Sequence, residues 1–542
     1  MATAKNAGAS KKTTTMKPSS GATFKATEGK ATAGKEWNPA AEPSAQAAAI
    51  QEVMAPRPAT TSRYPISNEA FEALKAAAPK AKLAQKSATV AKDPKTKPAA
   101  KGAALGPPAF APGLAPTATP TASTNFAGIA ATGWVPPDCT MAVGANHVLI
   151  SVNSSIAVYG NSGGAAVFQR TLTQWFANIV SGMTIFDPKA LYDQHAGRWV
   201  LLAVATRTGT QDSLFLLSVS ASSDPSGAWR NYKLDAALDG NKKTSNWADF
   251  PALGVDGNAL YLTANMFAFG GGFQYAKVRV IPKQGPYSGG AAPYFDFTRL
   301  KNADNTAVFT LQPCHTFGAP QLEYLVNTAF PSGNYLSVWH IQNAAATPTI
   351  TRSQVKVSPY SLAPNAQQKG DVAPVVLLNT GDVRVLHAVF RGGSIWTAFT
   401  AAHTWGAGPN RAAIQWCQIQ AATPSLVQEG IFGAAAYHYF YPAACPDNNG
   451  NMIMVMSRSG PSEFPSILYT GRRATDPLGA LQASSVLRAG AAHYEKTVSG
   501  RNRWGDYNGV ASDPANSRLV WFYSMYASAK DVWGTWVGSS FF

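Results

Sequence analysis

Short runs of apolar and β-branched residues alternate with turn residues along the whole chain beyond residue 125. Typical runs are HVLISV (147–152), RWVLLAV (198–204), SLFLLSV (213–219), ALYLTA (259–264) and RLVWFYS (518–524). Gly, Pro, Asn and Asp separate these runs, and no long stretch has the period of an amphipathic helix. The pattern therefore predicts an all-β domain.

The turns recur at a regular interval. Five clear turns place Asp, Asn or Gly just before a strand, near residues 143, 192, 255, 446 and 512, and two weaker ones fit near 319 and 390. The first and last turns are 369 residues apart over six steps, a mean period of about 62. Each period has room for four short strands, which is the repeat of a β-propeller. We expect a single propeller of seven four-stranded blades, with six or eight blades as the alternatives.

Residues 1–124 differ from this pattern. They hold 17 Lys and Arg against 7 Asp and Glu, whereas residues 125–542 hold 28 against 22 and carry 13 of the 14 Trp. A segment rich in Ala, Lys, Pro and Thr buries too little apolar surface to offset the entropy of ordering the chain. We therefore expect a disordered basic tail and linker over 1–124, followed by the propeller domain over 125–542.

Three features of the tail bear on partners and location. SNEAFEALKAA (67–77) can form a short helix capped by Ser67 or Asn68, with Phe71 and Leu74 on one side. The lysine-rich residues 78–104 are either a solvated spacer or a weak, salt-sensitive contact for a polyanion. The sequence has no apolar run long enough to span a membrane and no recognisable secretory signal peptide at its N-terminus.

The segment FAGIAATGWVPPDCTMAVGANHVLISVNSSIAVYGNSG (126–163) resembles the opening of a group of bacterial, mostly exported, β-propeller proteins. That group begins with a PPD…VG…VN pattern and ends with a WGDY element, which here is Trp504 to Tyr507. The resemblance implies a propeller and a secreted or cell-surface location, but no particular reaction. SSDPSGAW (222–229) and ATDPLGAL (474–481) are distantly similar to the Asp-box hairpins of sialidase-like propellers, where the aspartate satisfies loop amides.

An acidic position recurs six or seven residues before the turns. Aligning the repeats there collects Asp138, Asp187, Asp249, His315, His387, Tyr441 and Asp506. Equivalent positions of inner strands lie in a ring about the propeller axis, so we expect these side chains to form a collar at the channel mouth. The collar can bind a ligand, or its four aspartates, Asp138, Asp187, Asp249 and Asp506, can hold calcium. Alternatively the aspartates accept amide hydrogen bonds from neighbouring blades, or form an acid/base pair.

No complete catalytic constellation is present, so the sequence favours a non-enzymatic propeller that presents its loops and channel mouth to a glycan or a protein, with the basic tail as a tether. One alternative is a glycoside hydrolase or lyase that acts on a polysaccharide at an axial acid/base site. Another is a structural or assembly protein whose tail contacts an anionic polymer. The fold by itself does not choose among these functions.

Overall fold

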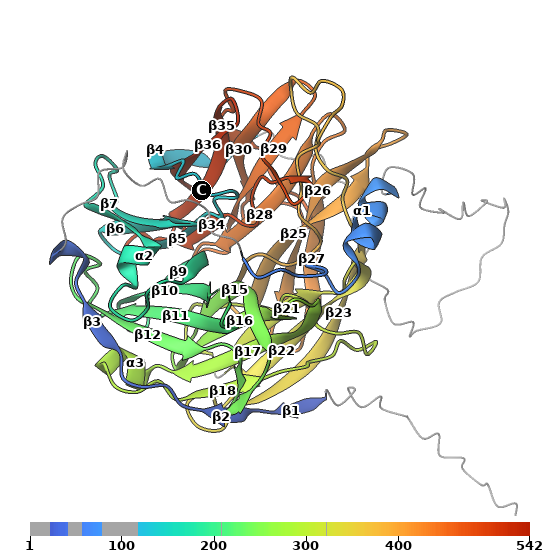
Figure 1. Cartoon of the computed structure of the whole chain (residues 1–542). Helices are drawn as coiled ribbons and strands as arrows, with labels where there is room; N and C mark the ends of the chain where they lie inside the picture. Colours follow the sequence, from blue (N-terminus) through green and yellow to red (C-terminus); the bar gives the residue numbers. More distant parts are fainter. Residues whose placement is uncertain (1–21, 42–56, 78–117, 208, 321) are drawn as a thin grey trace, which may run out of the picture.

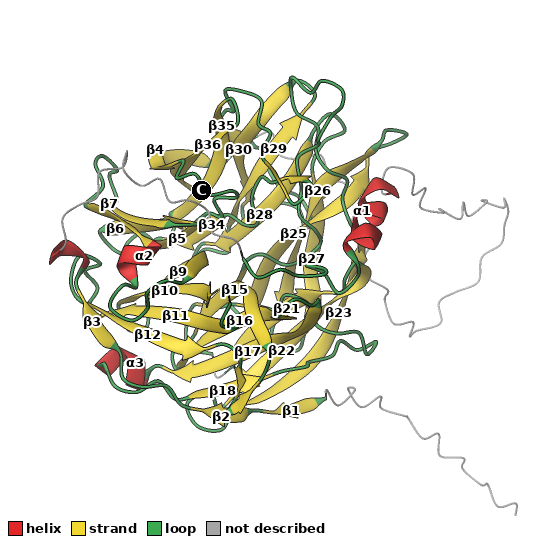
Figure 2. Ribbon diagram, viewed as in Figure 1, coloured by secondary structure: helices red, strands yellow, loops and turns green. Residues whose placement is uncertain are grey.

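Almost all regular structure in the computed structural model is β, arranged as sheets around one axis (Figures 1 and 2). The structure describes residues 22–41, 57–77, 118–207, 209–320 and 322–542. Within these ranges the helices are short: α1 (Asn68–Ala77), α2 (Leu172–Trp175), α3 (Gln284–Ser288) and the 3-10 turn η1 (Pro39–Ala41). No helix of the described part is long and apolar enough to cross a membrane. The prediction of a single all-β propeller is confirmed.

Three of the sheets have four strands. The first consists of β5 (Thr140–Val143), β6 (His147–Val152), β7 (Ser155–Gly160) and β8 (Phe168–Thr171). The second consists of β28 (His438–Pro446), β29 (Met452–Gly460), β30 (Glu463–Arg472) and β31 (Ser485–Arg488). The third consists of β34 (Gly509–Ser512), β35 (Val520–Ala529), β36 (Val532–Phe541) and β4 (Thr121–Ala130). The last sheet joins the two ends of the propeller, because β4 pairs antiparallel with the C-terminal strand β36. The propeller therefore begins at β4, slightly before the expected boundary at residue 125.

Two sheets have five strands. One is β9 (Thr184–Asp193), β10 (Arg198–Arg207), β11 (Asp212–Ser220) and β12 (Trp229–Asp235) with β3 (Lys35–Trp37) outside; the other is β19 (Gln312–Pro313), β21 (Glu323–Thr328), β22 (Ser332–Gln342) and β23 (Thr349–Ser361) with β1 (Thr23–Lys25) outside. Two two-stranded ribbons, β13 (Leu238–Asp239) with β14 (Lys242–Lys243) and β32 (Thr497–Val498) with β33 (Arg501–Asn502), lie in the connections.

The predicted count of seven separate four-stranded blades is wrong. Five sheets stand as blades of four or five strands in the described part of the chain, and the remaining strands form one ten-stranded sheet. Its strands run in the order β2 (Thr27–Gly29), β18 (Tyr294–Phe297), β17 (Phe273–Pro282), β16 (Ala259–Ala268), β15 (Asn246–Val255), β20 (His315–Thr316), β24 (Ala388–Arg391), β25 (Ser394–Thr404), β26 (Asn410–Gln420) and β27 (Ser425–Phe432). The cause is β20, whose His315 pairs parallel with Val255 on one side and Val389 on the other.

Residues 22–41 differ from the expectation of disorder, because their three strands extend the outer edges of the propeller. An outer strand has unpaired N–H and C=O groups, and β1, β2 and β3 pair antiparallel with β23, β18 and β12 respectively. Aromatic contacts reinforce the pairing: Phe24 lies 5.9 Å from Trp339 and Trp37 lies 4.4 Å from Trp175, between ring centroids. These residues are thus part of the folded unit.

Residues 57–77, which we call the strap, also pack on the propeller. The predicted helix is present as α1, where the Ser67 hydroxyl accepts from the Ala70 N–H at 3.1 Å. Phe71 is fully buried and stacks on Tyr64 at 3.7 Å, whereas Leu74 is 43% exposed and does not share this buried side as predicted. The lysine-rich segment 78–104 lies outside the described residues.

Large aromatic side chains fill the space between the sheets. In the described part of the chain eight tryptophans are fully buried, namely Trp175, Trp199, Trp229, Trp247, Trp339, Trp416, Trp504 and Trp521. The two Asp-box-like segments lie in turns between outer strands, as expected. Asp224 accepts from the Ser226 N–H at 2.9 Å and Asp476 from the Arg473 N–H at 2.8 Å. Their aspartates therefore satisfy loop amides.

Candidate functional site

A ring of strained residues lies within or just before the innermost strands. Asp138, Asp187, Phe250, Thr310 and Tyr441 all have φ between 52° and 55°. This left-handed conformation costs a non-glycine residue roughly 1–2 kcal/mol, so other contacts must hold it. The equivalent residue near 381 is a glycine, Gly381, with φ of 70°.

Side-chain oxygens of a neighbouring repeat accept hydrogen bonds from the backbone at this ring. The Asp187 N–H donates to Asn153 Oδ1 at 2.7 Å, and the Phe250 N–H donates to Asp187 Oδ2 at 3.2 Å. The Thr310 N–H donates to Asn265 Oδ1 at 2.8 Å, and the Tyr441 N–H donates to Thr400 Oγ1 at 3.1 Å. The Asp506 N–H donates to Asp138 Oδ1 at 2.8 Å. Two of the acceptors are the predicted aspartates Asp138 and Asp187. Their geometry supports the interpretation that these carboxylates close the ring by accepting amide hydrogen bonds.

Asp249 does not occupy the same position as Asp187. The structural equivalent of Asp187 is Phe250, which has the left-handed φ and donates to the preceding repeat. Asp249 precedes it by one residue, and its carboxylate faces the strap instead. A shift of one residue along a strand turns a side chain toward a different direction, which accounts for the difference.

The four predicted aspartates gather around an arginine of the strap. Arg57 Nη2 lies 2.8 Å from Asp187 Oδ1, and Arg57 Nη1 lies 3.3 Å from Asp249 Oδ1. The guanidinium carbon lies 4.3 Å from the centre of the Phe186 ring. Burial acts to lower the pKa of Arg57, but Asp187 and Asp249, with Asp138 and Asp506 behind them, raise it above its ordinary value. Arg57 is therefore a permanent cation at the centre of the collar.

The aspartates of the collar differ in protonation. Burial raises the pKa of Asp187 to about 6 against the opposing charge of Arg57, and burial together with Asp506 and Asp187 raises the pKa of Asp138 well above its ordinary value. Burial also acts to raise the pKa of Asp506, but Arg503 and Arg57 outweigh it and hold that pKa at about 2. Asp506 is thus the strongest acid of the three.

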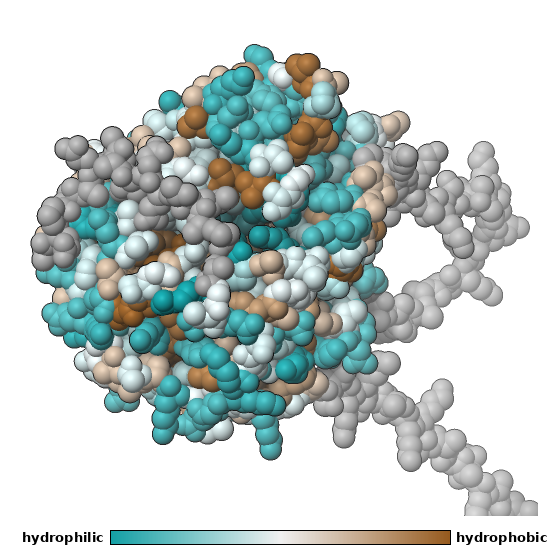
Figure 3. Space-filling view, viewed as in Figure 1, coloured by the Kyte–Doolittle hydropathy of each residue, from teal (hydrophilic) through white to brown (hydrophobic). Residues whose placement is uncertain are grey.

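The mouth cavity lies next to this collar and combines two adjoining hollows. The inner hollow is lined by Arg57, Arg63, Tyr64, Asp249, Phe250, Asn265, Phe267, Asn379, Gly381, Asp382, Arg384, Leu386, Tyr441, Arg501, Arg503 and Asp506. The outer hollow has a volume of about 680 Å³ and shares Arg57, Arg63, Tyr64, Arg501 and Arg503 with it. Hydrophilic side chains gather near the centre of the face that Figure 3 shows. The strap and the propeller therefore build this cavity together.

Two arginines of the mouth cavity have no acidic partner within the part of the chain that the structure describes. Arg384 pairs with Asp382 and Arg503 with Asp506, each at 2.6 Å, and Arg57 pairs as described above. Arg501 donates to the Tyr64 hydroxyl at 2.6 Å and forms no ion pair with a described residue, and Arg63 forms neither a hydrogen bond nor an ion pair with one. Burial and the charges of Arg57 and Arg503 lower the pKa of Arg63, although Asp249 opposes this. Two guanidinium groups of the cavity, those of Arg63 and Arg501, are therefore without an ion-pair partner among the described residues, and Glu72 lines the outer hollow as well.

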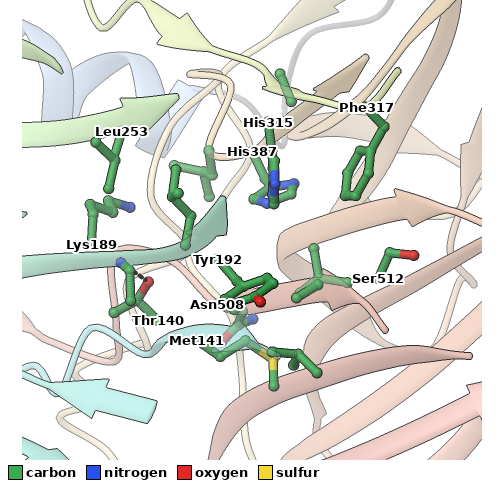
Figure 4. Close-up of a pocket in the computed structure, with 18 of the residues that line it drawn as sticks. Thr140, Met141, Lys189, Tyr192, Leu253, His315, Phe317, His387, Asn508 and Ser512 are labelled. Atoms are coloured by element: carbon green, nitrogen blue, oxygen red, sulfur yellow. Dashed lines mark hydrogen bonds between the residues drawn. The ribbon is translucent and has the colours of Figure 1, made fainter. Parts of the chain in front are cut away.

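An axial chamber lies further along the channel, and Leu386 lines both it and the mouth cavity. Its walls include Thr140, Met141, Lys189, Tyr192, Leu253, His315, Phe317, His387, Asn508 and Ser512, contributed by several inner strands (Figure 4). Burial lowers the pKa of His315 well below its ordinary value and that of His387 to about 4, so both imidazoles are neutral at pH 7. Lys189 is the one Lys, Arg, Asp or Glu among the described residues that line the chamber.

The structure thus divides the predicted collar into two groups. Asp249, Tyr441 and Asp506 line the mouth cavity, with Asp138 and Asp187 buried beside it. His315 and His387 line the axial chamber instead. His315 follows the ring residue Thr310 by five positions, and His387 follows the ring residue Gly381 by six. Because each residue of an extended chain advances about 3.3 Å along the strand, the two histidines lie well beyond the ring. The predicted alignment of the two histidines with the aspartates is therefore wrong.

The collar does not fit calcium. Its carboxylate oxygens accept from backbone and side-chain N–H groups, and the cation between Asp187 and Asp249 is the guanidinium of Arg57. Asp138 Oδ2 accepts from Asn153 Nδ2 at 2.6 Å. Among the described residues no group of three or more His, Cys, Asp or Glu is placed to hold a metal ion.

Sequence reasoning missed the arginines and Lys189. Arg501 and Arg503 directly precede the WGDY element, and Lys189 stands in the DPKALYD segment, but a lone basic residue in a repeat has no spacing that indicates a site. Arg57 and Arg63 fall in the part of the chain that was expected to be disordered. Only the folded strap brings them to the mouth.

Comparison with known proteins gives a likeness of fold. No family model and no curated protein matches the chain. Among solved structures, the WD40 domain of SCAP from fission yeast matches at 10% identity and a TM-score of 0.32, covering 73% of this chain and 82% of that one. Drosophila Plexin A in complex with Semaphorin 1b matches at 8% identity and a TM-score of 0.34, covering 78% and 88%.

Glycan-acting enzymes are also among the structural neighbours. The α-L-arabinanase of Cellvibrio cellulosa, complexed with arabinohexaose, matches at 11% identity and a TM-score of 0.28, covering 64% of this chain and 96% of that one. A Trypanosoma rangeli sialidase mutant that displays trans-sialidase activity matches at 8% identity and a TM-score of 0.32, covering 65% and 53%. At these identities and TM-scores the likenesses carry no argument about activity or ligand.

Proposed function

We propose that this protein is a non-enzymatic binding propeller whose mouth cavity holds a carboxylate-bearing glycan. The single observation that carries the proposal is the pair Arg63 and Arg501, which face the cavity without an acidic partner among the described residues. A buried or half-buried guanidinium without a counter-ion is costly, and a ligand carboxylate removes that cost with two parallel N–H···O bonds. Arginine suits this task because its planar fork matches a carboxylate.

The size of the cavity favours a sugar over a flat protein surface. Its outer hollow of about 680 Å³ is within the range of small-ligand sites, and the aromatic ring of Tyr64 stands beside the arginines. An acidic side chain of a protein partner offers the same carboxylate chemistry, so such a partner is the other outcome of the test. The tail contact with an anionic polymer remains a prediction, since residues 78–104 lie outside the described part.

The glycoside-hydrolase alternative has weaker support. Asp138 and Asp506 differ in pKa in the way that an acid/base pair requires. The carboxylate of Asp138, however, is fully buried and accepts from the Asp506 N–H and from Asn153 Nδ2. A group whose oxygens already bind the ring cannot reach a glycosidic bond without opening that ring.

The test is calorimetric titration of the full-length protein with digalacturonic acid and with the neutral digalactose of the same linkage. We expect the acid to bind at least tenfold more tightly, because removal of a charged hydrogen bond costs about 1.5–3 kcal/mol. Arg63→Gln and Arg501→Gln should each weaken binding about tenfold or more. Arg473→Gln, which makes the same charge change at an exposed position outside the cavity, is the matched control.

Equal binding of the acidic and neutral sugars, or equal affinity of the Arg63 and Arg473 variants, contradicts the proposal. A glutamate-rich peptide titrated in parallel distinguishes the partner class. If the peptide binds in an Arg63-dependent way and neither sugar does, the mouth cavity binds an acidic protein segment rather than a glycan. Both variants keep the basic tail, so its contribution cancels.

A further inference from the structure

The amine of Lys189 stands in the axial chamber, and no described residue forms a hydrogen bond with it. Lys189 lies on the innermost strand β9, two residues after Asp187, and its side chain lines the chamber (Figure 4). Its Nζ atom makes neither a hydrogen bond nor an ion pair with a described residue. The contacts of the amine are the faces of two aromatic rings, Tyr507 at 2.9 Å and Phe250 at 5.8 Å from the ring centres.

The surroundings favour the neutral amine at physiological pH. Burial lowers the pKa of Lys189 to about 7, although Asp187, Asp138 and Asp506 act to raise it. About half of this amine is then neutral at pH 7, against about 1 in 2,500 for an exposed lysine of pKa 10.4. The neutral amine has the free lone pair that makes lysine a nucleophile.

A neutral imidazole stands in the same chamber as the amine. His387 Nδ1 contacts the Ala444 carbonyl oxygen at 3.2 Å, and the pKa of His387 is lowered by burial and also by the charge of Lys189. Among the described residues, neither a carboxylate nor an arginine lines the chamber. Part of the chamber wall is apolar and is formed by Leu253, Leu386 and Met141. The chamber therefore offers a nucleophile, a proton-transfer group and a space for a small uncharged molecule.

A second lysine shows that burial alone does not create this situation. Burial also lowers the pKa of Lys75 to about 7. The amine of Lys75, however, donates to Thr380 Oγ1 at 3.0 Å and to the Gly381 carbonyl oxygen at 2.5 Å, and it lines neither the mouth cavity nor the axial chamber. Lys75 is thus a matched internal control, because its pKa is lowered to the same value but its amine does not face a cavity that a small molecule can enter.

We propose that the axial chamber is a covalent binding site in which Lys189 captures the carbonyl group of a small aldehyde or ketone as an imine. The lone pair of Nζ attacks the carbonyl carbon, and the carbonyl oxygen takes up a proton to give a carbinolamine. Loss of the hydroxyl group as water and of a proton from nitrogen then forms the C=N bond. His387 is placed in the same chamber to pass protons between nitrogen and oxygen.

Reductive trapping tests this on the full-length protein. The protein is incubated with propanal and sodium cyanoborohydride at pH 7, and peptide mass mapping follows alkylation of every lysine with time. Hydride from the reductant converts the imine into a stable secondary amine. We expect Lys189 to react at least tenfold faster than the exposed Lys242 and Lys243, and Lys75 to react no faster than these two.

The size of the aldehyde distinguishes reaction inside the chamber from a high reactivity that is due only to the low pKa of the lysine. Replacement of propanal by naphthaldehyde should abolish the preference for Lys189, because the chamber has a volume of only about 50 Å³, too small for a bicyclic aldehyde. The proposal is overturned if Lys189 reacts no faster than the exposed lysines, if Lys75 reacts as fast as Lys189, or if naphthaldehyde shows the same preference. None of these outcomes depends on Arg63 or Arg501, so they are independent of the glycan-binding proposal.

Discussion

Arg57 and Asp187 form a 2.8 Å ion pair across 130 positions of the chain. Arg57 belongs to the strap and Asp187 to an innermost strand, so this pair fastens a segment from the N-terminal part over the end of the channel. The same aspartate accepts the Phe250 N–H with its other oxygen. One carboxylate thus joins the ring of strands to the strap, and the mouth cavity depends on both.

Removal of the Arg57 charge should destabilise the protein. Arg57→Met leaves Asp187 and Asp249 without their cation, and breaking a buried ion pair in this way costs about 3–5 kcal/mol. Lys243→Met is the control, since its 2.6 Å pair with Asp235 joins an exposed and a partly exposed side chain and is worth less than about 1 kcal/mol. Urea denaturation measures both. Similar losses in the two variants would show that the strap is not held by Arg57.

Helix α1 should be held against the propeller by the side of the helix that carries Phe71. Phe71→Ala removes a fully buried ring that stacks on Tyr64, so we expect a loss of about 3–5 kcal/mol in the free energy of unfolding. Leu74→Ala, three residues on at an exposed position, should change stability by less than about 0.5 kcal/mol. Thermal unfolding of the two variants distinguishes a docked helix from a detached one, for which both changes would be small.

Asp138 should contribute to ring closure and not to ligand binding. In Asp138→Asn, one oxygen still accepts the Asp506 N–H, but the new NH₂ group faces the Asn153 amide donor. We expect a loss of about 1–3 kcal/mol with an unchanged affinity of the mouth cavity for an acidic sugar. Asp212→Asn at an exposed ion pair serves as the control for stability. If Asp138→Asn instead lowered the affinity for the acidic sugar and left the free energy of unfolding unchanged, Asp138 would be a ligand-binding residue.

Asp506 should make stability depend on pH below 4. Because Arg503 and Arg57 hold its pKa at about 2 in the folded protein, below the ordinary value of 3.8, the unfolded chain binds more protons between these limits. The stability that Asp506 contributes is therefore fully present above pH 4 and is lost as the pH falls toward 2. The difference in unfolding free energy between the wild type and Asp506→Asn should be about 2 kcal/mol at pH 6 and shrink below pH 4. A difference that does not vary with pH would contradict this.

The sequence pattern identified the helix at Asn68–Ala77 because its cap and its buried Phe71 are local features. It did not reveal that Leu74 stays exposed while Lys75 is buried, since the propeller surface decides which side of the helix docks. The same limit applies to the collar. Asp138 and Asp187 have a recognisable position before a turn, whereas the ring position next to Asp249 belongs to Phe250, and a one-residue offset in an irregular strand leaves no trace in composition.

By itself, the sequence determined that this chain is an all-β repeat in which an acidic position recurs before several of the turns. Alternating apolar runs and recurrent turns specify strands through local physics. The tertiary structure alone decided how strands join into sheets, because the parallel pairing of His315 with Val255 and Val389 fuses two sets of strands. It also decided that Arg57, Arg63 and Arg501 meet at one cavity and that Lys189 faces a chamber. Contacts between residues more than a hundred positions apart create these sites, and no local pattern encodes such contacts.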